Sequence, residues 1–240
     1  MKDLHSHIIP GIDDGAKTMH ESLLMAEQAV SNGVTHMVCT PHIHPSFFDN
    51  DRVNIEQGFI ALADNVKQEG IPLSLSFAAE VRVNDLIPIW LKNNELPFIG
   101  TYEGKNVLLL EMPHSHVPSS LDMLIKWLIN NNVQPLVAHP ERNRDILKQP
   151  HLLQWLQRLG CLFQVTAGAF TGRFGEHVQA LSKQMLVDKA FHIVASDTHD
   201  THRRPNEMKK AYDVVASYDE AFAQTAFLTL PSRILSKKSG

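Results

Sequence analysis

The chain has 240 residues, of which 43% are hydrophobic and 20% charged, so it is long enough to bury a full core, and its formal net charge of −4 argues against a general nucleic-acid binder. It contains no apolar run near the roughly 18 residues of a membrane span, no hydrophobic signal region at its start, and only two cysteines, Cys39 and Cys161. We therefore expect a cytoplasmic protein without a disulfide framework, which binds no nucleic acid and inserts into no membrane.

Short apolar runs alternate with longer helical patterns along the chain. Seven runs predict strands: Lys2–His7, Val34–Thr40, Leu73–Glu80, Asn106–Glu111, Gln134–His139, Cys161–Thr166 and His192–Asp197. Several are apolar at consecutive positions, which is typical of parallel strands covered on both faces. Both cysteines fall in such runs, so we interpret them as core residues.

The segments between these runs carry apolar residues at helical spacing. Four show it clearly: HESLLMAEQAVSNG, closed by Gly33; DRVNIEQGFIALADNVKQEG, with Asp51 as N-cap and Gly70 at its end; SSLDMLIKWLINN, behind a serine cap; and RPNEMKKAYDVVASY, with Pro205 in its first turn and Met208, Ala211, Tyr212 and Val215 buried. About seven β–α units in series predict a parallel sheet, as a closed barrel or a doubly wound sheet. No linker or repeat divides the chain, so we expect one domain over residues 1–240.

Side chains that bind metals follow most of the predicted strands. In chain order they are His5 and His7, His42, Glu80, Glu111, His139, and finally Asp197 with His199. The carboxyl ends of the strands of a parallel barrel converge on one pocket, which favours the barrel and predicts a site for several ions. His5 and His7, two apart on a strand, point to the same face, so both can bind one ion.

Each of these residues alone has a simpler interpretation. An Asp or Glu after a strand often caps the next helix, and we interpret lone histidines as structural or surface residues: His36, His151, His177 and His192. So many His, Asp and Glu residues at the same end of six strands favour the interpretation as a metal-binding site. Imidazole and carboxylate ligands suit Mn²⁺, Fe²⁺ or Zn²⁺ without selecting among them. A carboxylate such as Glu80 or Asp197 could bridge two ions about 3.5–4 Å apart, a frequent solution for hydrolysing phosphate esters.

Two arginines follow predicted strand ends, Arg142 in HPERNR and Arg204 in DTHDTHRR. Guanidinium groups can clamp the oxygens of a phosphate, and we predict both as catalytic residues, although solvated loop arginines are the simpler interpretation. Arg144 and Arg203 are weaker candidates. Several divalent ions would outweigh the carboxylates around them, so an acidic protein can still hold a positive pocket for an anionic substrate.

The motifs DLHSHIIPGIDDG, CTPHIHP, AAEVR, LLLEM, VAHPERN and ASDTH together resemble the PHP (polymerase and histidinol phosphatase) family. The closer resemblance is to its bacterial branch of capsular and exopolysaccharide metal-dependent protein-tyrosine phosphatases. It implies an α/β fold, a distorted TIM-like (β/α)7 barrel, around three divalent ions, with manganese expected and iron or zinc as alternatives. The implied ligand sets are His5, His7, Glu80 and Asp197; Glu80, Glu111 and His139; and Asp14, His42 and His199. Arg142 and Arg204 match the family's phosphate-binding arginines.

The resemblance implies a protein-tyrosine phosphatase in which a hydroxide bridging two ions attacks phosphorus. The implied partner is the phosphotyrosine tail of a bacterial tyrosine autokinase involved in polysaccharide synthesis. The main alternative is a histidinol-phosphatase-like enzyme acting on a small phosphate ester; an amide or lactone hydrolase and a non-catalytic metal-stabilised module are others. A cysteine-based phosphatase is excluded, because the residues six after Cys39 and Cys161 are Pro45 and Ala167 rather than arginine.

Substrate recognition is less clearly encoded. The segment IHPSFFDN and the C-terminal FLTLPSRILSKKSG depart from what the resemblance implies, and the sequence names no general acid, although His44 and His202 lie near the motifs. Aromatic contacts at the barrel mouth are expected from among Phe47, Phe48, Tyr102, Phe170 and Phe174. The glycine-rich TAGAFTGRFG predicts a mobile loop that gates the site. A homo-oligomer is compatible with the sequence.

Overall fold

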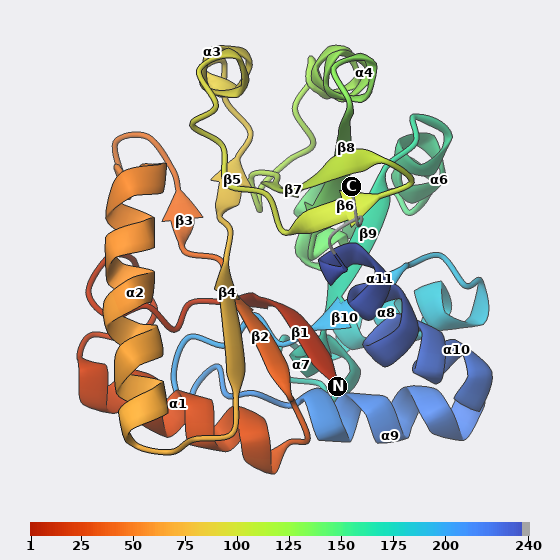
Figure 1. Cartoon of the computed structure of the whole chain (residues 1–240). Coiled ribbons are helices and arrows are strands. Elements are labelled where there is room, and N and C mark those ends of the chain that lie inside the picture. Colours follow the sequence, from red (N-terminus) through yellow and green to blue (C-terminus); the bar gives the residue numbers. More distant parts are fainter. Residues whose placement is uncertain (237–240) are drawn as a thin grey trace.

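Strands that run parallel to one another form a ring at the centre of the computed structural model, which describes residues 1–236 (Figure 1). The last four residues of the predicted domain, 237–240, lie outside the described part. The strands are β1 Lys2–Ser6, β2 His36–Cys39, β3 His42–Ile43, β4 Ser74–Phe77, β5 Glu80–Arg82, β6 Gly100–Tyr102, β7 Lys105–Glu111, β8 Val133–Ala138, β9 Leu162–Thr166 and β10 Ile193–Ala195. Strand β2 leads into β3 and β4 into β5 across short breaks, so these four make two bent paths.

Seven parallel strand paths complete the ring. Strand β1 pairs with β2, which pairs with β4, while β3, β5, β7, β8, β9 and β10 follow one another in a second sheet. The ring closes where the Asp197 N–H donates to the His5 carbonyl at 2.9 Å and the His7 N–H to the Thr198 carbonyl at 2.9 Å. Strand β6 is the exception, since it pairs antiparallel with β7. The predicted fold class, a distorted TIM-like barrel, is confirmed.

Helices connect the strand paths and cover the outside of the ring (Figure 1). They are α1 Met19–Ser31, α2 Arg52–Gln68, α3 Ile87–Lys92, α4 Leu121–Asn130, α5 Arg144–Lys148, α6 His151–Arg158, α7 Ala167–Phe170, α8 Glu176–Val187, α9 Met208–Tyr218, α10 Glu220–Gln224 and α11 Leu230–Leu235, with a single 3-10 turn at Pro140–Arg142 and a π-helical turn at Thr225–Thr229. None of the helices in the described part of the chain combines the length and apolar character that crossing a bilayer requires.

The predicted helix ends are partly right. Asp51 caps α2 in a capping box with Asn54, and Gly33 and Gly70 follow their helices with φ of 78° and 67°, values that favour glycine. Ser120 stands at the N-cap of α4, but its side chain makes no capping hydrogen bond. The expectation for Pro205 is wrong, because α9 begins three residues later.

Two further corrections concern α9 and the third predicted strand. Helix α9 begins at Met208, where the Asn206 side chain accepts the Met208 N–H at 3.2 Å, and Tyr212 is only half-buried. The predicted strand Leu73–Glu80 is divided into β4 and β5, because the chain bends between them to follow the curvature of the ring.

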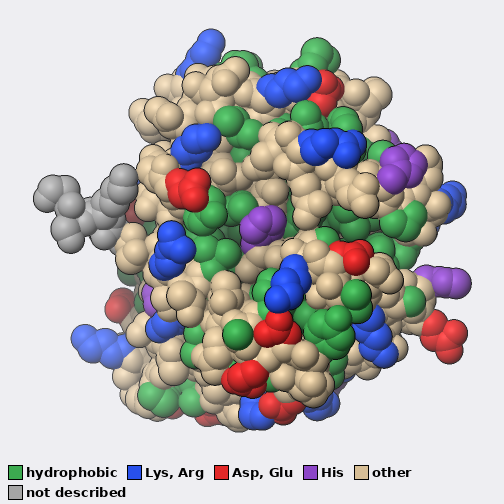
Figure 2. All heavy atoms as spheres, turned by 90° about the vertical axis from the view of Figure 1, so that its right-hand side faces the viewer, with side chains coloured by type: hydrophobic (Ala, Val, Ile, Leu, Met, Phe, Trp, Pro, Cys, Tyr) green, Lys and Arg blue, Asp and Glu red, His purple; other side chains and the backbone are tan. Residues whose placement is uncertain are grey.

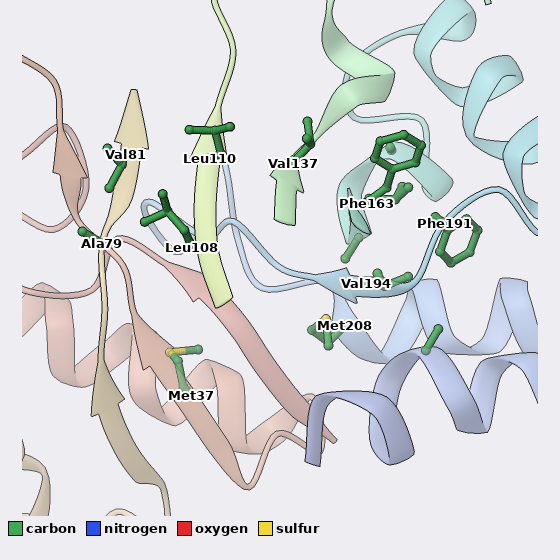
Figure 3. Packing of buried hydrophobic residues seen from close by; sticks show 14 of the residues in the cluster. Met37, Ala79, Val81, Leu108, Leu110, Val137, Phe163, Phe191, Val194 and Met208 are labelled. Carbon is green, nitrogen blue, oxygen red and sulfur yellow. The ribbon is translucent and has the colours of Figure 1, made fainter. Parts of the chain in front are cut away.

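Apolar residues pack on both sides of the strand ring. Alternate residues of β7 show this: Leu108 and Leu110 pack outward with Val137 of β8 and Val194 of β10, and Met208 of α9 lies against Val194 (Figure 3). The alternating residues of β7, Val107 and Leu109, face inward. They form a second cluster inside the ring with side chains from all of the remaining strand paths. Its members include Leu4, Val38, Ala78, Val107, Leu109, Leu136, Leu162 and Ile193.

Helix α11 and strand β6 close the amino-terminal end of the barrel. Leu230 and Ile234 of α11 belong to the inner cluster, as does Ile99 just before β6. Gly100 allows the close approach, because a Cβ there would lie 2.0 Å from the Ile234 carbonyl oxygen. With this end filled by apolar side chains, the carboxyl end of the strands is the one left for polar residues.

The glycine-rich segment predicted as a mobile loop is instead the short helix α7 and a turn. Its residues Ala167–Phe170 are buried. Arg173, in the turn, donates from Nε to Glu207 Oε2 at 2.7 Å and from Nη2 to Glu207 Oε1 at 2.8 Å. The expected loop is therefore wrong, since the segment packs against α9 and is tied to it by a bidentate ion pair.

Candidate metal centre

The polar cluster lies at the carboxyl end of the strand ring. Its side chains point inward because alternate residues of each strand face the interior of the ring. Along β7, Val107 and Leu109 belong to the inner cluster, and Glu111 follows on the same side of the strand. Along β9, Leu162 belongs to the inner cluster, and Gln164 follows two residues later on the same side of the strand. The interior of the barrel thus changes from apolar to polar along each strand, and the polar end is where the predicted ligands meet.

The first group of ligand atoms joins both ends of the chain. His5 Nε2 lies 3.2 Å from Asp197 Oδ1 and 3.3 Å from Glu80 Oε2, and His7 Nε2 lies 3.3 Å and 3.4 Å from the same two oxygens. A register shift in β1 between Asp3 and Ser6 turns the strand locally. The four side chains are the set that the resemblance implied for one ion, and they can hold a common ion.

A second group gathers around Asp14, the predicted ligand that follows no strand directly. Asp14 Oδ1 lies 3.4 Å from His42 Nε2 and 3.3 Å from His199 Nε2. The His7 ring also belongs to this group, with its centroid 3.9 Å from that of His199. The structure therefore brings the implied set together and adds His7, which stands between the two groups.

A third group surrounds Glu111. His139 Nε2 lies 2.8 Å from Glu80 Oε1, and Glu111 can share an ion either with His42 and Glu80 or with His114 and His139. Glu80 thus has one oxygen toward His139 and the other toward the first group, the arrangement of a bridging carboxylate. His114 is a side chain that the sequence reasoning missed; its position three residues after Glu111, in EMPHSH, is the signal.

Two of the converging residues have strained backbone. His139 has a φ of 34° and Asp197 a φ of 52°, a left-handed region that is unfavourable for residues other than glycine. His139 directly follows β8, and Asp197 lies two residues after β10, where the chain leaves the strand. Strain of this kind persists where the surrounding structure fixes it, and it is frequent at functional sites.

Three more buried contacts orient the ligands, and the sequence reasoning named none of them. Gln164 Oε1 accepts from His5 Nδ1 at 2.9 Å, and Asp13 Oδ2 accepts from His7 Nδ1 at 2.7 Å, so both rings have Nε2 free toward the centre. Arg82 Nη1 lies 3.0 Å from Glu111 Oε1. A lone glutamine in the apolar strand CLFQVT, and the first aspartate of GIDDG, are signals that could have identified two of these.

Both predicted arginines reach the same carboxylate oxygen. Arg142 Nη1 and Arg204 Nη2 each lie 2.5 Å from Asp197 Oδ2, while Asp197 Oδ1 faces His5 and His7. The two guanidinium groups therefore stand side by side next to the ligand cluster. They present positive charge at the edge of an acidic pocket, which is the arrangement that a phosphate dianion needs.

The protonation states at the centre suit metal binding. Burial by itself raises the pKa of Asp197, but Arg204 and the neighbouring histidines together outweigh it, and the pKa lies well below its usual range. Burial lowers the pKa of His139 to about 3 and that of His199 to about 4. Ionised carboxylates and neutral imidazoles are the forms that coordinate metal ions.

The carboxylates around Glu80 and Glu111 give this part of the cluster an excess of negative charge. Burial and the neighbouring Glu80 raise the pKa of Glu111 to about 7. Burial lowers the pKa of His5 and His7, but nearby carboxylates outweigh it, so both pKa values lie above their usual range. The carboxylates thus attract positive charge, whether protons or metal ions.

Unpartnered atoms give a direct test of whether the cluster fits metal ions. Among the described residues, the buried side-chain atoms without a hydrogen-bond partner include His42 Nδ1, Glu80 Oε2, Glu111 Oε2, Asp197 Oδ1 and His199 Nε2. All five belong to predicted ligands. Buried polar atoms are normally paired, so five that share one pocket and have lone pairs to donate fit metal ions well.

The predicted aromatic contacts divide into two groups. Phe48 stacks on His42, with ring centroids 5.3 Å apart, and the Phe174 ring lies 4.5 Å beneath the Arg142 guanidinium. Phe47, which precedes Phe48 in the chain, stacks on His44 and is exposed. The expectation of a contact at the barrel mouth is wrong for Phe170 and Tyr102. Phe170 is buried in the core against α9, and Tyr102 packs against the inner cluster at the closed end of the barrel. Phe48 and Phe174 thus contact predicted site residues, and Phe47 lies next to Phe48 in the chain.

Sequence comparison relates the chain to a known family. The model of the family described as "Capsular polysaccharide synthesis, CpsB/CapC" matches residues 1–236. The chain belongs to the CpsB/CapC family. Among its relatives, the tyrosine-protein phosphatase YwqE of Bacillus subtilis is 32% identical over 215 residues, which cover 90% of this chain and 84% of YwqE. The resemblance drawn from the motifs is thereby confirmed.

Solved structures agree with this family. A crystal structure from work on YwqE of Bacillus subtilis and CpsB of Streptococcus pneumoniae, described there as metal-dependent tyrosine phosphatases, superposes on the CpsB/CapC chain with a TM-score of 0.90. It is 30% identical, and the match covers 98% of this chain and 94% of that one. The lactonase Lmo2620 of Listeria monocytogenes, 14% identical with a TM-score of 0.54 over 98% and 94% of the two chains, shares the fold.

Proposed function

We propose that this CpsB/CapC-family protein is a metal-dependent phosphatase that removes phosphate from tyrosine residues. The observation that carries the proposal is the placement of Arg142 and Arg204 on one oxygen of Asp197 while its other oxygen faces the ligand cluster. A phosphate group bound there would be reached by the arginines from one side and by the cluster from the other. The names of the relatives, tyrosine-protein phosphatases, support the same activity.

The cluster would hold three divalent ions, and we propose manganese as the metal. The proposed ligand sets are His5, His7, Glu80 and Asp197; Glu80, Glu111 and His139; and Asp14, His42 and His199. Bound ions of this kind supply Lewis-acid polarisation of phosphoryl oxygens and lower the pKa of an attacking water. The unpartnered nitrogen and oxygen atoms of five of these residues support the assignment.

The protein's own residues would bind and orient the phosphate. Arg142 and Arg204 donate hydrogen bonds that neutralise the equatorial oxygens as negative charge spreads over them. Asp197 holds both guanidinium groups at one edge of the cluster, so their positions are fixed before the substrate arrives. A tyrosine leaving group, with a pKa of about 10, needs less protonation than a serine alkoxide, so no dedicated general acid is required.

We propose as substrate the phosphorylated tyrosine tail of a bacterial tyrosine autokinase that acts in polysaccharide synthesis. An extended tail would reach the centre from the open, carboxyl end of the strand ring. The description of the family as one of capsular polysaccharide synthesis supports this context. We propose that residues 1–240 form one phosphatase domain that works in the cytoplasm.

The decisive experiment compares phosphate release from a tyrosine-phosphorylated peptide and from histidinol phosphate, each with Mn²⁺ and with a chelator. We expect release from the peptide to be faster and to stop when the chelator removes the ions. Faster release from histidinol phosphate would assign the protein to small-molecule metabolism on the same barrel. Release that persists in the chelator would contradict the metal-dependent mechanism.

Two variants connect this activity to the proposed ligands. His42→Ala and Glu80→Gln should each lower phosphate release by at least about a hundredfold, because the first removes a proposed ligand nitrogen and the second replaces a charged carboxylate oxygen with an amide nitrogen. Circular dichroism should show the fold of both variants to be retained. Turnover equal to that of the unmodified protein in both variants would refute the ligand sets.

A further inference from the structure

A tight turn after β3 presents an exposed aromatic ring next to the candidate metal centre. In this turn the His44 N–H donates to the Phe48 carbonyl at 3.0 Å, and the Phe48 N–H to the His44 carbonyl at 2.8 Å. Asp49 Oδ1 accepts the Ser46 N–H at 2.7 Å, and Ser46 has a φ of 69°. The turn is therefore fixed by its own hydrogen bonds.

The turn is anchored to the centre through stacked rings. Phe48 lies nearly parallel to the ring of His42, a proposed ligand, with 10° between the planes. His44, which pairs with Phe48 across the turn, stacks on Phe47 with ring centroids 4.5 Å apart. Phe47 therefore lies in the same turn as Phe48, one residue before the ring that stacks on His42.

The stacking on His44 covers only a small part of the Phe47 ring. Its side chain is 74% exposed, the highest value among the exposed large hydrophobic residues of the described chain. Full burial of a phenylalanine stabilises a protein, so a rigid turn that keeps this ring in water forgoes that gain. An exposed ring at the mouth of a site is the type of residue that binds ligands.

We propose that Phe47 binds the aromatic ring of the substrate and so selects aryl over alkyl phosphates. The inference rests on the proposed function, since it assigns a contact to the tyrosine side chain of that substrate. A ring held at the mouth would pack against the phenyl group while the phosphate lies between Arg142 and Arg204. A small polar ester such as histidinol phosphate would gain nothing comparable from this contact.

The test measures binding of phenylphosphonate and methylphosphonate to the manganese-loaded protein by calorimetry. These probes share the phosphonate group and differ in the ring, so the ratio of their affinities isolates the aryl contact. We expect Phe47→Ala to lower the ratio by about three- to tenfold, the size of one aromatic contact, and Phe47→Trp to retain it. Tyr218→Ala, which removes an exposed aromatic residue at the end of α9, should leave the ratio unchanged.

An unchanged ratio in Phe47→Ala would overturn the inference, as would an equal loss of affinity for both probes. The KM of the phosphotyrosine peptide should rise in Phe47→Ala with little change in kcat, because the contact forms on binding. Failure of the proposed function gives a different result. In that case the unmodified protein releases no phosphate from the peptide, whereas the affinity ratio still reports whether Phe47 contacts an aryl ring.

Discussion

Single side chains decide which nitrogen of each histidine faces the centre. Gln164 and Asp13 accept hydrogen bonds from Nδ1 of His5 and His7, so Nε2 of each ring faces the carboxylates of the cluster. Gly15 has a related role: a Cβ at this position would lie 2.0 Å from the His7 carbonyl oxygen. The GIDDG motif therefore supports His7 from two sides besides providing Asp14.

Asp13 gives the prediction that belongs to this scale. Asp13→Ala should lower the affinity for Mn²⁺ by about 10–100-fold, because the His7 ring loses the hydrogen bond that fixes its tautomer and orientation. Calorimetric titration of the metal-free protein measures this directly, without any assay of activity. Asp64→Ala, which removes an exposed carboxylate of α2, serves as the control. Equal metal affinity in both variants would show that Asp13 does not orient His7.

At the scale of elements, the segment that follows β9 is held by α9. Arg173 donates twice to Glu207, at the start of α9, and Thr171 Oγ1 donates to Glu207 Oε2 at 2.8 Å. Phe174, next in the chain, lies beneath Arg142. The ion pair therefore stabilises the packing of α7 on α9 and also places the aromatic surface on which a proposed catalytic arginine rests.

We expect Arg173→Ala to lower the free energy of unfolding by about 1.5–3 kcal/mol, because the Glu207 carboxylate loses charge-assisted hydrogen bonds while buried. Urea unfolding of the metal-free protein measures the loss. Lys210→Ala is the matched control, since this lysine lies 3.6 Å from the same carboxylate but is 71% exposed. Its loss should remain below about 1 kcal/mol. Similar losses in the two variants would contradict the assignment.

The effect of Arg173 should also depend on pH. Burial by itself raises the pKa of Glu207, but the hydrogen bonds from Arg173 and Thr171 outweigh it and lower that pKa below its usual value. A lowered pKa in the folded state gives stability that is complete above the unfolded pKa, about 4.3, and is lost as the pH falls through the folded pKa. The difference in stability between the unmodified protein and Arg173→Ala should therefore shrink as the solution is acidified below about pH 4.

At the scale of the whole molecule, the proposed ions would join strand paths from the start of the chain to its end. The ligand groups bring together residues of β1, β3, β5 and β7 with the residues that follow β8 and β10. Charge is mixed on the face shown in Figure 2, where Lys and Arg side chains alternate with Asp and Glu and neither sign covers the surface. The ligand cluster, by contrast, gathers the buried carboxylates Glu80, Glu111 and Asp197 at the carboxyl end of the ring.

Metal binding should therefore stabilise the whole fold. An ion bound only by the folded state, at a hundredfold excess over its dissociation constant, adds about 2.7 kcal/mol. For a chain of this size, the melting temperature in Mn²⁺ should exceed that in a chelator by about 5–10 °C. Scanning calorimetry measures the difference, and His42→Ala should reduce it. Equal melting temperatures with and without metal would argue against ions that bridge the strand paths.

The sequence by itself determined the barrel and most of the candidate site. Strand patterns that are apolar until a final His, Asp or Glu show both where each strand ends and which side chains point into the ring, since the period of a strand is two residues. For this reason eight predicted ligands and two arginines could be named from the strand pattern before their neighbours were known, whereas Asp14 was implied only by the family resemblance. The N-cap of α2 at Asp51 could also be predicted from the sequence, because its hydrogen-bond partner Asn54 lies only three residues away.

Only the tertiary structure decided which residues support the site. Gln164 meets His5 across 159 residues of chain, and Arg173 meets Glu207 across 34, so no local pattern records either pair. The same reason explains the wrong expectation for TAGAFTGRFG, whose glycines predict mobility while its packing on α9 removes it. The local sequence pattern indicates which way a side chain faces. The residue that it contacts depends on closure of the ring, because closure brings distant parts of the chain together.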